Sequence, residues 1–360
     1  MMLAAAYILL TFLLGIYSYA LIDPNITFFQ HPLWVAFRDP LVQFGYYNRE
    51  GSWWVYFLLI TALFALSFFA VRYYKKINVM ILALLLGGFL LFSYPFLSHD
   101  FFNYMFDAKI FTYYHQNPYF QKALDFPGDQ WTRFMHWTHR SYPYGPIFLI
   151  LSFIPAFLGF GKFAISFLLF KVFFISCYLI SVYLLNKLDK KWAIMFATSP
   201  LIIIEGLISS HNDIVAVALG IIGVYFILEK KKIGGTLFIL FSGGIKYITA
   251  PLIFLLNKKL YKIALLLQLI VLTYLSFKME IQPWYFLSLF IFLPFFPEFI
   301  ERLQIFFFGL LMSYYPYIRL GGWDTAEKVN LKHQIIIVFF ALNVLYLLLQ
   351  LHRDLRKAKK

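Results

Sequence analysis

Long runs of apolar residues, separated by short polar stretches, repeat along the whole chain. Several runs hold about 20 residues, which is the length that a helix needs to cross the hydrocarbon core of a bilayer. The pattern predicts an all-α polytopic membrane protein with about 10–12 transmembrane or re-entrant helices in one domain, 1–360. The expected segments are approximately 3–22, 53–71, 77–97, 146–160, 163–185, 192–208, 213–228, 233–256, 262–278, 283–297, 303–318 and 333–351.

Composition agrees with this pattern. Hydrophobic residues make up 62% of the 360 residues and charged residues 13%, and the mean hydropathy is +0.74. These values exclude a soluble globular protein. The first apolar run lacks a basic leader and a small-residue cleavage site, so we expect a retained span and not a signal peptide. The single Cys177 excludes an internal disulfide and a cysteine metal cluster.

The net charge of +14 gives the expected orientation. The basic residues gather at the ends of apolar segments, at 72–76, 230–232, 258–262 and 356–360. Short basic loops of this kind lie on the cytoplasmic side of a membrane, so the charge indicates topology and not a nucleic-acid partner. We therefore expect a plasma (inner) membrane protein with both termini in the cytoplasm.

The same rule places three polar stretches together on the extracytoplasmic side. They are the loop 98–145, the stretch 209–213 and the stretch 282–285. The loops 23–52 and 98–145 are rich in aromatic residues and are expected to form interfacial helices around an outer-face cavity.

Two regions do not fit as simple spans. If 186–191 is cytoplasmic, segments 146–160 and 163–185 cannot both cross the membrane, so one is expected to be short or re-entrant. Segment 233–256 has basic loops at both ends and is interpreted as a possible hairpin of two half-length helices, with Lys246 at its apex.

The first candidate site begins at the end of the third predicted span. Asp100, Tyr104 and Asp107 are spaced so that they share one face if this stretch is helical, and Ser98 is placed to cap that helix. A carboxylate beside an apolar wall is a suitable general base for an acceptor hydroxyl. His99 is interpreted as an orienting or phosphate-binding neighbour. The alternative for both acids is a solvated helix start.

The loop that follows interleaves aromatic and basic residues between 131 and 146. Arg133, Arg140 and Tyr142 fit a pocket that recognises a sugar ring and a phosphate, although an interfacial aromatic belt has the same composition. The histidines lack a supporting spacing of cysteine or carboxylate partners, so no metal site is predicted. The sequence gives no firm reason to expect a cofactor, and it leaves a divalent metal open but unsupported. The chain has no Walker loop, dinucleotide fingerprint or nucleophile elbow.

Two further groups fall on the same predicted side. One combines Glu205 with His211, Asn212 and Asp213, of which Asp213 alone is also explained as a first-turn helix residue. The other consists of Lys246, which is suited to phosphate capture or snorkelling, and the pair Trp284 and Tyr285, which opens a segment after Pro283.

Taken in order, these motifs resemble the integral-membrane glycosyltransferases of the GT-C superfamily, and in particular the branches that use polyprenyl- or dolichyl-phosphate mannose. The resemblance covers about residues 80–290. It rests on the following residues in this sequence: Asp100, Tyr104, Asp107-Ala108, Asn117-Pro118-Tyr119, Tyr142-Pro143-Tyr144-Gly145-Pro146, Glu205 to Asp213, Lys246 and Pro283-Trp284-Tyr285. The chain departs from the family where paired acids are common, because His99-Asp100 stands there.

The resemblance implies a hexosyltransferase, mannosyltransferase-like, that acts in cell-envelope glycan assembly. Its expected partners are a polyprenyl-phosphate-linked sugar donor, a glycan, lipid or protein acceptor, and membrane lipid. In this mechanism Lys246, with Arg133, Arg140 or His211, holds the donor phosphate, and Asp100 is the base in an inverting displacement.

Two other functions remain open from the sequence. A transporter or flippase of a lipid-linked saccharide also places charges within the membrane, but at the midplane and in two repeated halves. A non-catalytic assembly or polymerase subunit would not need two acids aligned on a helix face.

Overall fold

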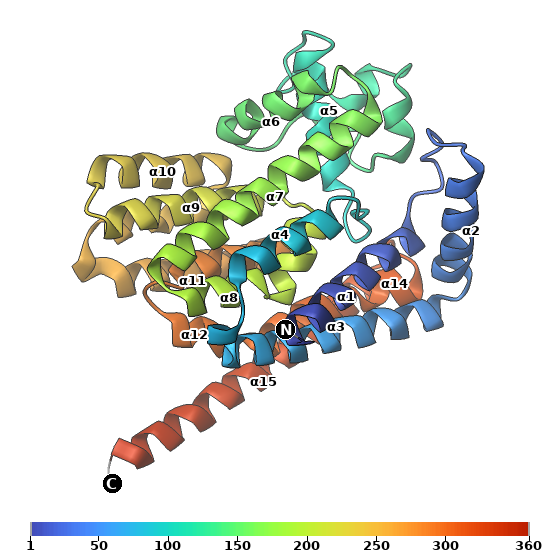
Figure 1. Ribbon diagram of the computed structural model, residues 1–360. Helices are drawn as coiled ribbons and strands as arrows, with labels where there is room; N and C mark the ends of the chain where they lie inside the picture. The colour runs from blue at the N-terminus through green and yellow to red at the C-terminus, as the bar shows by residue number, and fades with distance from the viewer. Residues whose placement is uncertain (1, 359–360) are drawn as a thin grey trace.

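The computed structural model describes residues 2–358, which form helices and loops without any strand (Figure 1). An isolated bridge between Lys122 and Ser141 is the one β-type pairing in this part of the chain. The prediction of an all-α polytopic membrane protein is confirmed. Five helices are long and apolar enough to cross a membrane: Met2–Leu21, Arg49–Arg72, Phe163–Leu188, Lys258–Lys278 and Ala326–Arg356.

Most of the helices are joined by short connections, but a loop of residues 113–145 separates α5 from α6. The first part contains α1 (Met2–Tyr17), α2 (Pro32–Tyr47), α3 (Arg49–Arg72), α4 (Val79–Leu90), α5 (Asp100–Thr112), α6 (Pro146–Leu158) and α7 (Phe163–Leu188). The second part contains α8 (Lys190–Ala197), the π-helical segment Ile202–Ile208, α9 (Asp213–Leu228), α10 (Lys232–Ile245), the 3-10 helix Tyr247–Leu256, α11 (Tyr261–Lys278), the 3-10 helix Pro283–Phe292, α12 (Pro297–Glu301), α13 (Gln304–Met312), α14 (Tyr315–Leu320) and α15 (Ala326–Ala358).

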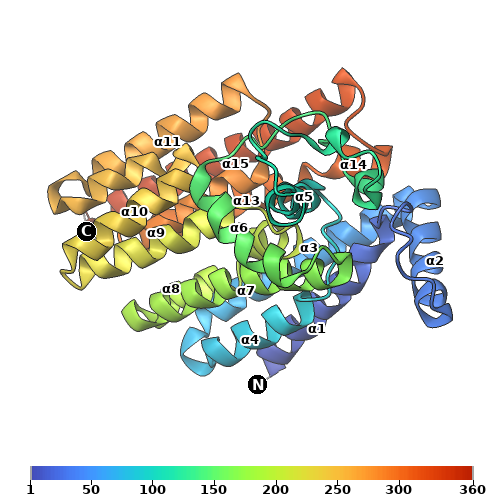
Figure 2. The same ribbon diagram turned by 90° about the horizontal axis from the view of Figure 1, so that it is seen from above.

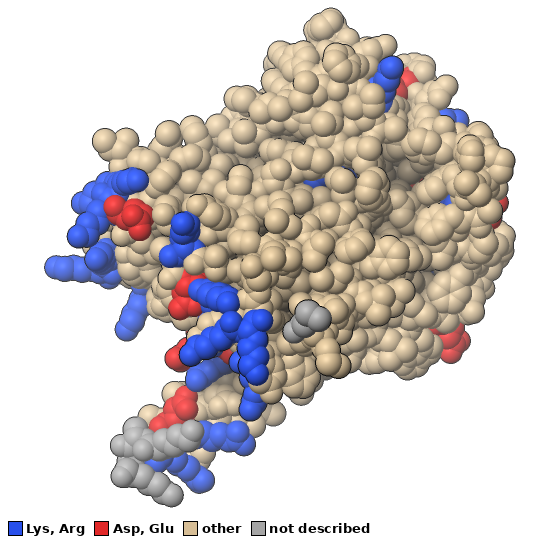
Figure 3. Space-filling view, viewed as in Figure 1, with Lys and Arg blue, Asp and Glu red and all other residues tan. Residues whose placement is uncertain are grey.

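The basic loops meet at one end of the helices. Lys190 donates a hydrogen bond to the Lys75 carbonyl at 3.0 Å, and Lys191 pairs with Glu301 at 2.7 Å. Arg302 in turn contacts Asp354 near the C-terminus. In Figure 3 the blue side chains gather over the lower left of the molecule, away from α5. We call this the basic end; its cytoplasmic placement stays a prediction.

The structure resolves the two ambiguous regions. α6 has 13 residues and packs beside α5, where Phe111 stacks on Phe153 at 4.3 Å, whereas α7 has 26 residues and full spanning length. The short piece is therefore 146–158. Segment 233–256 is a hairpin of α10 and the 3-10 helix, joined at Lys246 in extended backbone, as the sequence indicated.

The chain bends sharply after α8, just before the polar stretch 209–213. α8 and the π-helical segment Ile202–Ile208 together have the length of a span but meet at 67°. The turn that follows has a positive φ of 54° at Ser210. Lys171, fully buried in α7, donates to the carbonyl oxygens of Leu207 and Ile208 at 2.7 and 2.9 Å. These contacts satisfy carbonyl groups that the end of the helix leaves without partners.

α5 stands above the bundle at the end opposite the basic loops. It is labelled at the top of Figure 1, and Figure 2, seen from above, shows it nearly end-on near the centre of the molecule. The side chains from Asp100 to Ile110 are all buried. Both acids of α5 therefore lie inside the protein, which argues against the alternative of a solvated helix start.

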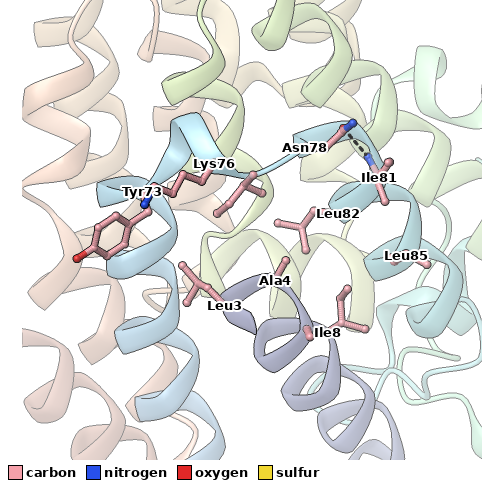
Figure 4. A pocket seen from close by; sticks show the side chains of 11 residues that line it. Leu3, Ala4, Ile8, Tyr73, Lys76, Asn78, Ile81, Leu82 and Leu85 are labelled. Carbon is pink, nitrogen blue, oxygen red and sulfur yellow. Dashed lines mark hydrogen bonds between the residues drawn. The ribbon is translucent and has the colours of Figure 1, made fainter. Parts of the chain in front are cut away.

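An open groove of about 610 Å³ lies beside the N-terminal half of α1 (Figure 4). Its lining comes from α1, the turn before α4, and α4, and it is mostly apolar, with Tyr73, Lys76 and Asn78 at one side. None of the residues that line the groove belongs to α5, to the stretch 209–213 or to the α10 hairpin. The groove takes no part in the candidate site.

Candidate active site

The N-terminus of α5 positions the first acid. The Ser98 hydroxyl accepts a hydrogen bond from the Asp100 backbone N–H at 3.2 Å, and α5 starts at that residue. The predicted cap contact is thus present, although His99 occupies the position just before the helix. Because the stretch is helical, Asp100, Tyr104 and Asp107 share one face as expected.

A line of buried side chains runs from Asp100 into the protein. His211 Nδ1 lies 3.8 Å from Asp100 Oδ2, and His211 Nε2 lies 3.4 Å from Glu205 Oε2. The Tyr314 hydroxyl donates to Glu205 Oε1 at 3.0 Å. Neither His211 nitrogen has a hydrogen-bond partner among the described residues, but a small rotation would convert its separations from the two carboxylates into hydrogen bonds. The arrangement can orient the imidazole between two carboxylates.

Stacking fixes the plane of that imidazole. The His211 ring lies on Trp284 with a centroid separation of 3.8 Å and an interplanar angle of 18°. His211 and Glu205 are both fully buried. The predicted convergence of the stretches 209–213 and 282–285 on Asp100 is therefore present in the structure.

Lys246 approaches the same place from the apex of the α10 hairpin. Its ammonium group pairs with Asp213 at 2.6 Å and lies 5.5 Å from the ring centre of Tyr144 and 5.7 Å from that of Tyr285. The lysine side chain keeps 15% exposure, whereas Asp213 keeps 3%. Lys246 is thus a partly accessible cation near two tyrosine rings.

Two buried amides beside these groups have unused hydrogen-bonding atoms. Both side-chain polar atoms of Asn212 and Oδ1 of Asn103 are buried and lack a partner among the described residues. The Asn212 backbone N–H points to the Tyr104 hydroxyl at 3.5 Å. Buried polar groups without partners are rare in proteins, so these atoms are ready to contact a polar ligand.

Burial raises the basicity of both acids on α5. It raises the pKa of the Asp100 carboxyl above its ordinary value, against the opposing charges of Lys246 and Arg140. For Asp107, burial raises the pKa to about 8, and Arg140 again opposes the shift. A carboxylate with a raised pKa takes up a proton more readily at neutral pH.

The remaining predicted residues divide into those near the acids and those apart from them. The Arg140 guanidinium lies over the Trp137 ring at 4.9 Å, and its charge acts on both acids. Tyr142 donates to the Gly145 carbonyl at 3.0 Å and so shapes the entry to α6. Arg133 lies apart, donating to the Gln130 carbonyl beside the Phe28 ring.

His99 faces away from the group around His211. Its Nε2 lies 3.8 Å from Asp23 Oδ2, and its ring stacks on His136 at 3.6 Å. Sequence reasoning selected neither of these partners. It also missed Tyr314 and Lys171; an ionisable residue in the middle of an apolar segment was the available signal for Lys171, whereas nothing local marks Tyr314.

The assembled site contains a buried carboxylate beside an imidazole, and a lysine that pairs with a second carboxylate near two tyrosine rings. The model of the MptA_B family, described as alpha-(1->6)-mannopyranosyltransferase, N-terminal domain, matches residues 29–258. The chain therefore belongs to this family and is a glycosyltransferase, with mannosyl transfer as its activity. No curated protein and no solved structure matches the chain.

Proposed function

We propose that this protein transfers a mannosyl residue from a polyprenyl-phosphate donor to an acceptor hydroxyl on the extracytoplasmic face, with inversion and with Asp100 as general base. The observation that carries the proposal is the contact of Asp100 with His211, together with the Lys246 charge that acts on both. These residues come from α5, the turn before α9 and the apex of the α10 hairpin. Their site lies at the end of the bundle opposite the basic loops, which the positive-inside rule assigns to the cytoplasm.

In this proposal the donor phosphate binds beside Lys246. A phosphate in this position would meet the Lys246 ammonium, the guanidinium of Arg140 and the free amide of Asn212. Charge-assisted contacts of this kind are the strong contacts to phosphate. Tyr144 and Tyr285 supply flat surfaces for a sugar ring.

The chemical step is a direct displacement. The acceptor oxygen gives its proton to Asp100 as it forms a bond to the anomeric carbon. The bond from that carbon to the phosphate oxygen breaks, and the polyprenyl phosphate leaves as an anion. His211, held by Glu205 and Trp284, fixes the orientation of Asp100, while Asp107, protonated at neutral pH, can donate a hydrogen bond to the acceptor.

The stereochemistry follows from this single displacement. A β-linked donor gives an α-linked product, in agreement with the α-(1→6) linkage in the family description. The acceptor would then be the 6-hydroxyl of a mannose residue.

The test is the reaction of purified protein with β-linked polyprenyl-phosphate mannose and an α-mannoside acceptor. Asp100→Asn should lower turnover by at least about a hundredfold, since general base catalysis contributes factors of about 10²–10⁴. Asp125→Asn is the matched control, because Asp125 is an exposed acid in the loop that follows α5. Near-normal turnover of Asp100→Asn, or movement of the intact lipid-linked sugar without transfer, would contradict the proposal.

A further inference from the structure

We propose that Asp23, His99 and His136 bind one divalent transition-metal ion of the zinc class. The site lies beside Asp100, the proposed general base, and is separate from Lys246 and its neighbours. The three residues come from the segment after α1, from the residue before α5, and from the loop 131–146. Each offers one ligand atom, and these atoms all lie within 4.8 Å of one another.

The distances are close to those of a bound site. Asp23 Oδ2 and His99 Nε2 are 3.8 Å apart. With Zn–N and Zn–O bonds of about 2.0–2.1 Å, the ligand atoms of a tetrahedral site lie about 3.4 Å apart. The rings of His99 and His136 are now stacked at 16°, so binding requires the exposed His136 ring to turn until both lone pairs point to one ion.

Asp23 is prepared to act as a ligand. Its Oδ1 accepts a hydrogen bond from the Asn25 backbone N–H at 2.8 Å, which leaves Oδ2 facing His99. Its own backbone N–H points to the Tyr94 hydroxyl at 3.2 Å. The carboxylate is thereby held in one orientation without using the oxygen that would bind the metal.

His99 supplies the independent observation. The residue is 7% exposed, and its Nε2 is buried and lacks a hydrogen-bond partner among the described residues. That nitrogen lies 3.8 Å from Asp23 Oδ2, and the His136 ring is stacked on the His99 ring. An imidazole nitrogen is seldom buried without a partner, and a metal ion satisfies it.

The ligand set indicates the class of metal. Two imidazoles and one carboxylate suit zinc and neighbouring transition metals, whereas calcium and magnesium prefer sites made of oxygen atoms. Three protein ligands leave a fourth position open. Because His99 directly precedes Asp100, the ion would link the start of α5 to the segment after α1. It would thereby position Asp100, the proposed general base.

The experiment uses the full chain in detergent, stripped with EDTA and titrated with Co²⁺, whose visible absorption reports tetrahedral binding. We expect saturation at one ion per chain, and displacement of Co²⁺ by Zn²⁺. Asp23→Asn and His136→Gln should each weaken binding by more than about tenfold. His139→Gln is the control, because His139 is an exposed histidine on the same loop outside the cluster, and it should bind as the wild type does.

The measurement needs no sugar donor, so its outcome is independent of the proposed reaction. The inference is overturned if the wild type shows no saturable Co²⁺ absorption, or if His136→Gln binds as tightly as the wild type. Should a variant unfold, X-ray absorption of the wild-type Co²⁺ complex decides the matter: two imidazoles in the first shell support the site, and none refutes it.

Discussion

The ion pair of Lys246 and Asp213 allows the stability and the activity of this protein to be separated. Lys246→Met removes the cation and leaves the Asp213 carboxylate, with 3% exposure, without its partner. The double variant Lys246→Met/Asp213→Asn removes both charges. We expect the two variants to differ in stability and to share the same loss of activity.

The magnitudes follow from the burial of the pair. Removing one partner of a buried ion pair costs about 3–5 kcal/mol, and the 15% exposure of the lysine favours the lower end. The double variant should recover to within about 1 kcal/mol of the wild type, since no charge is left unpaired. Loss of a charged contact to phosphate costs about 2–3 kcal/mol, which corresponds to about 30- to 150-fold in kcat/KM.

The assay measures thermal unfolding in detergent and kcat/KM for the lipid-phosphate donor on the same samples. The single variant should unfold at a clearly lower temperature, whereas the double variant should unfold near the wild-type temperature. Both should use the donor poorly. Full activity in the stable double variant would refute the role of Lys246 in holding the phosphate.

Two further predictions concern Asp107 and the two residues, Tyr314 and Glu205, that lie behind His211. The Asp107 carboxyl has an ordinary pKa of 3.8 in the unfolded chain and a pKa of about 8 in the folded protein. Its contribution to the stability of the fold is therefore greatest below pH 4 and is lost as the pH rises to 8. Asp107→Asn should raise the thermal midpoint at pH 8 and not at pH 4, and an equal effect at both pH values would contradict the burial of this carboxyl. Tyr314→Phe and Glu205→Gln should each lower kcat by about tenfold with little change in KM for the donor. The reason is that the wild-type side chains orient His211 and do not touch the substrate. A change in KM alone, in steady-state kinetics, would contradict this role.

Much of the fold was accessible from the sequence because each membrane helix carries its own signal. The runs of apolar residues predicted the long spans, and the basic loops predicted which polar stretches would meet. The charges on both sides of 233–256 indicated the hairpin, and the structure places Lys246 at its apex. These features are local in the sequence, so a single chain suffices to find them.

The features that were missed depend on contacts between distant residues. Asp23 is an ordinary residue at the end of a span until the fold places it beside His99 and His136. Without that carboxylate, the spacing of the histidines gave no reason to expect a metal. Tyr314, between α13 and α14, likewise meets Glu205 of the π-helical segment across 109 positions of the chain. The role of Arg133 in binding phosphate stays a prediction: its contacts are the Gln130 carbonyl on its own loop and the Phe28 ring in the segment after α1.

The most direct test of the account is a structure of the protein with a bound polyprenyl phosphate. We predict the phosphate within hydrogen-bonding distance of Lys246 Nζ, with the lipid leaving toward the bilayer and Asp100 free on the acceptor side. A phosphate bound in the groove between α1 and α4, remote from Asp100 and Lys246, would contradict the account.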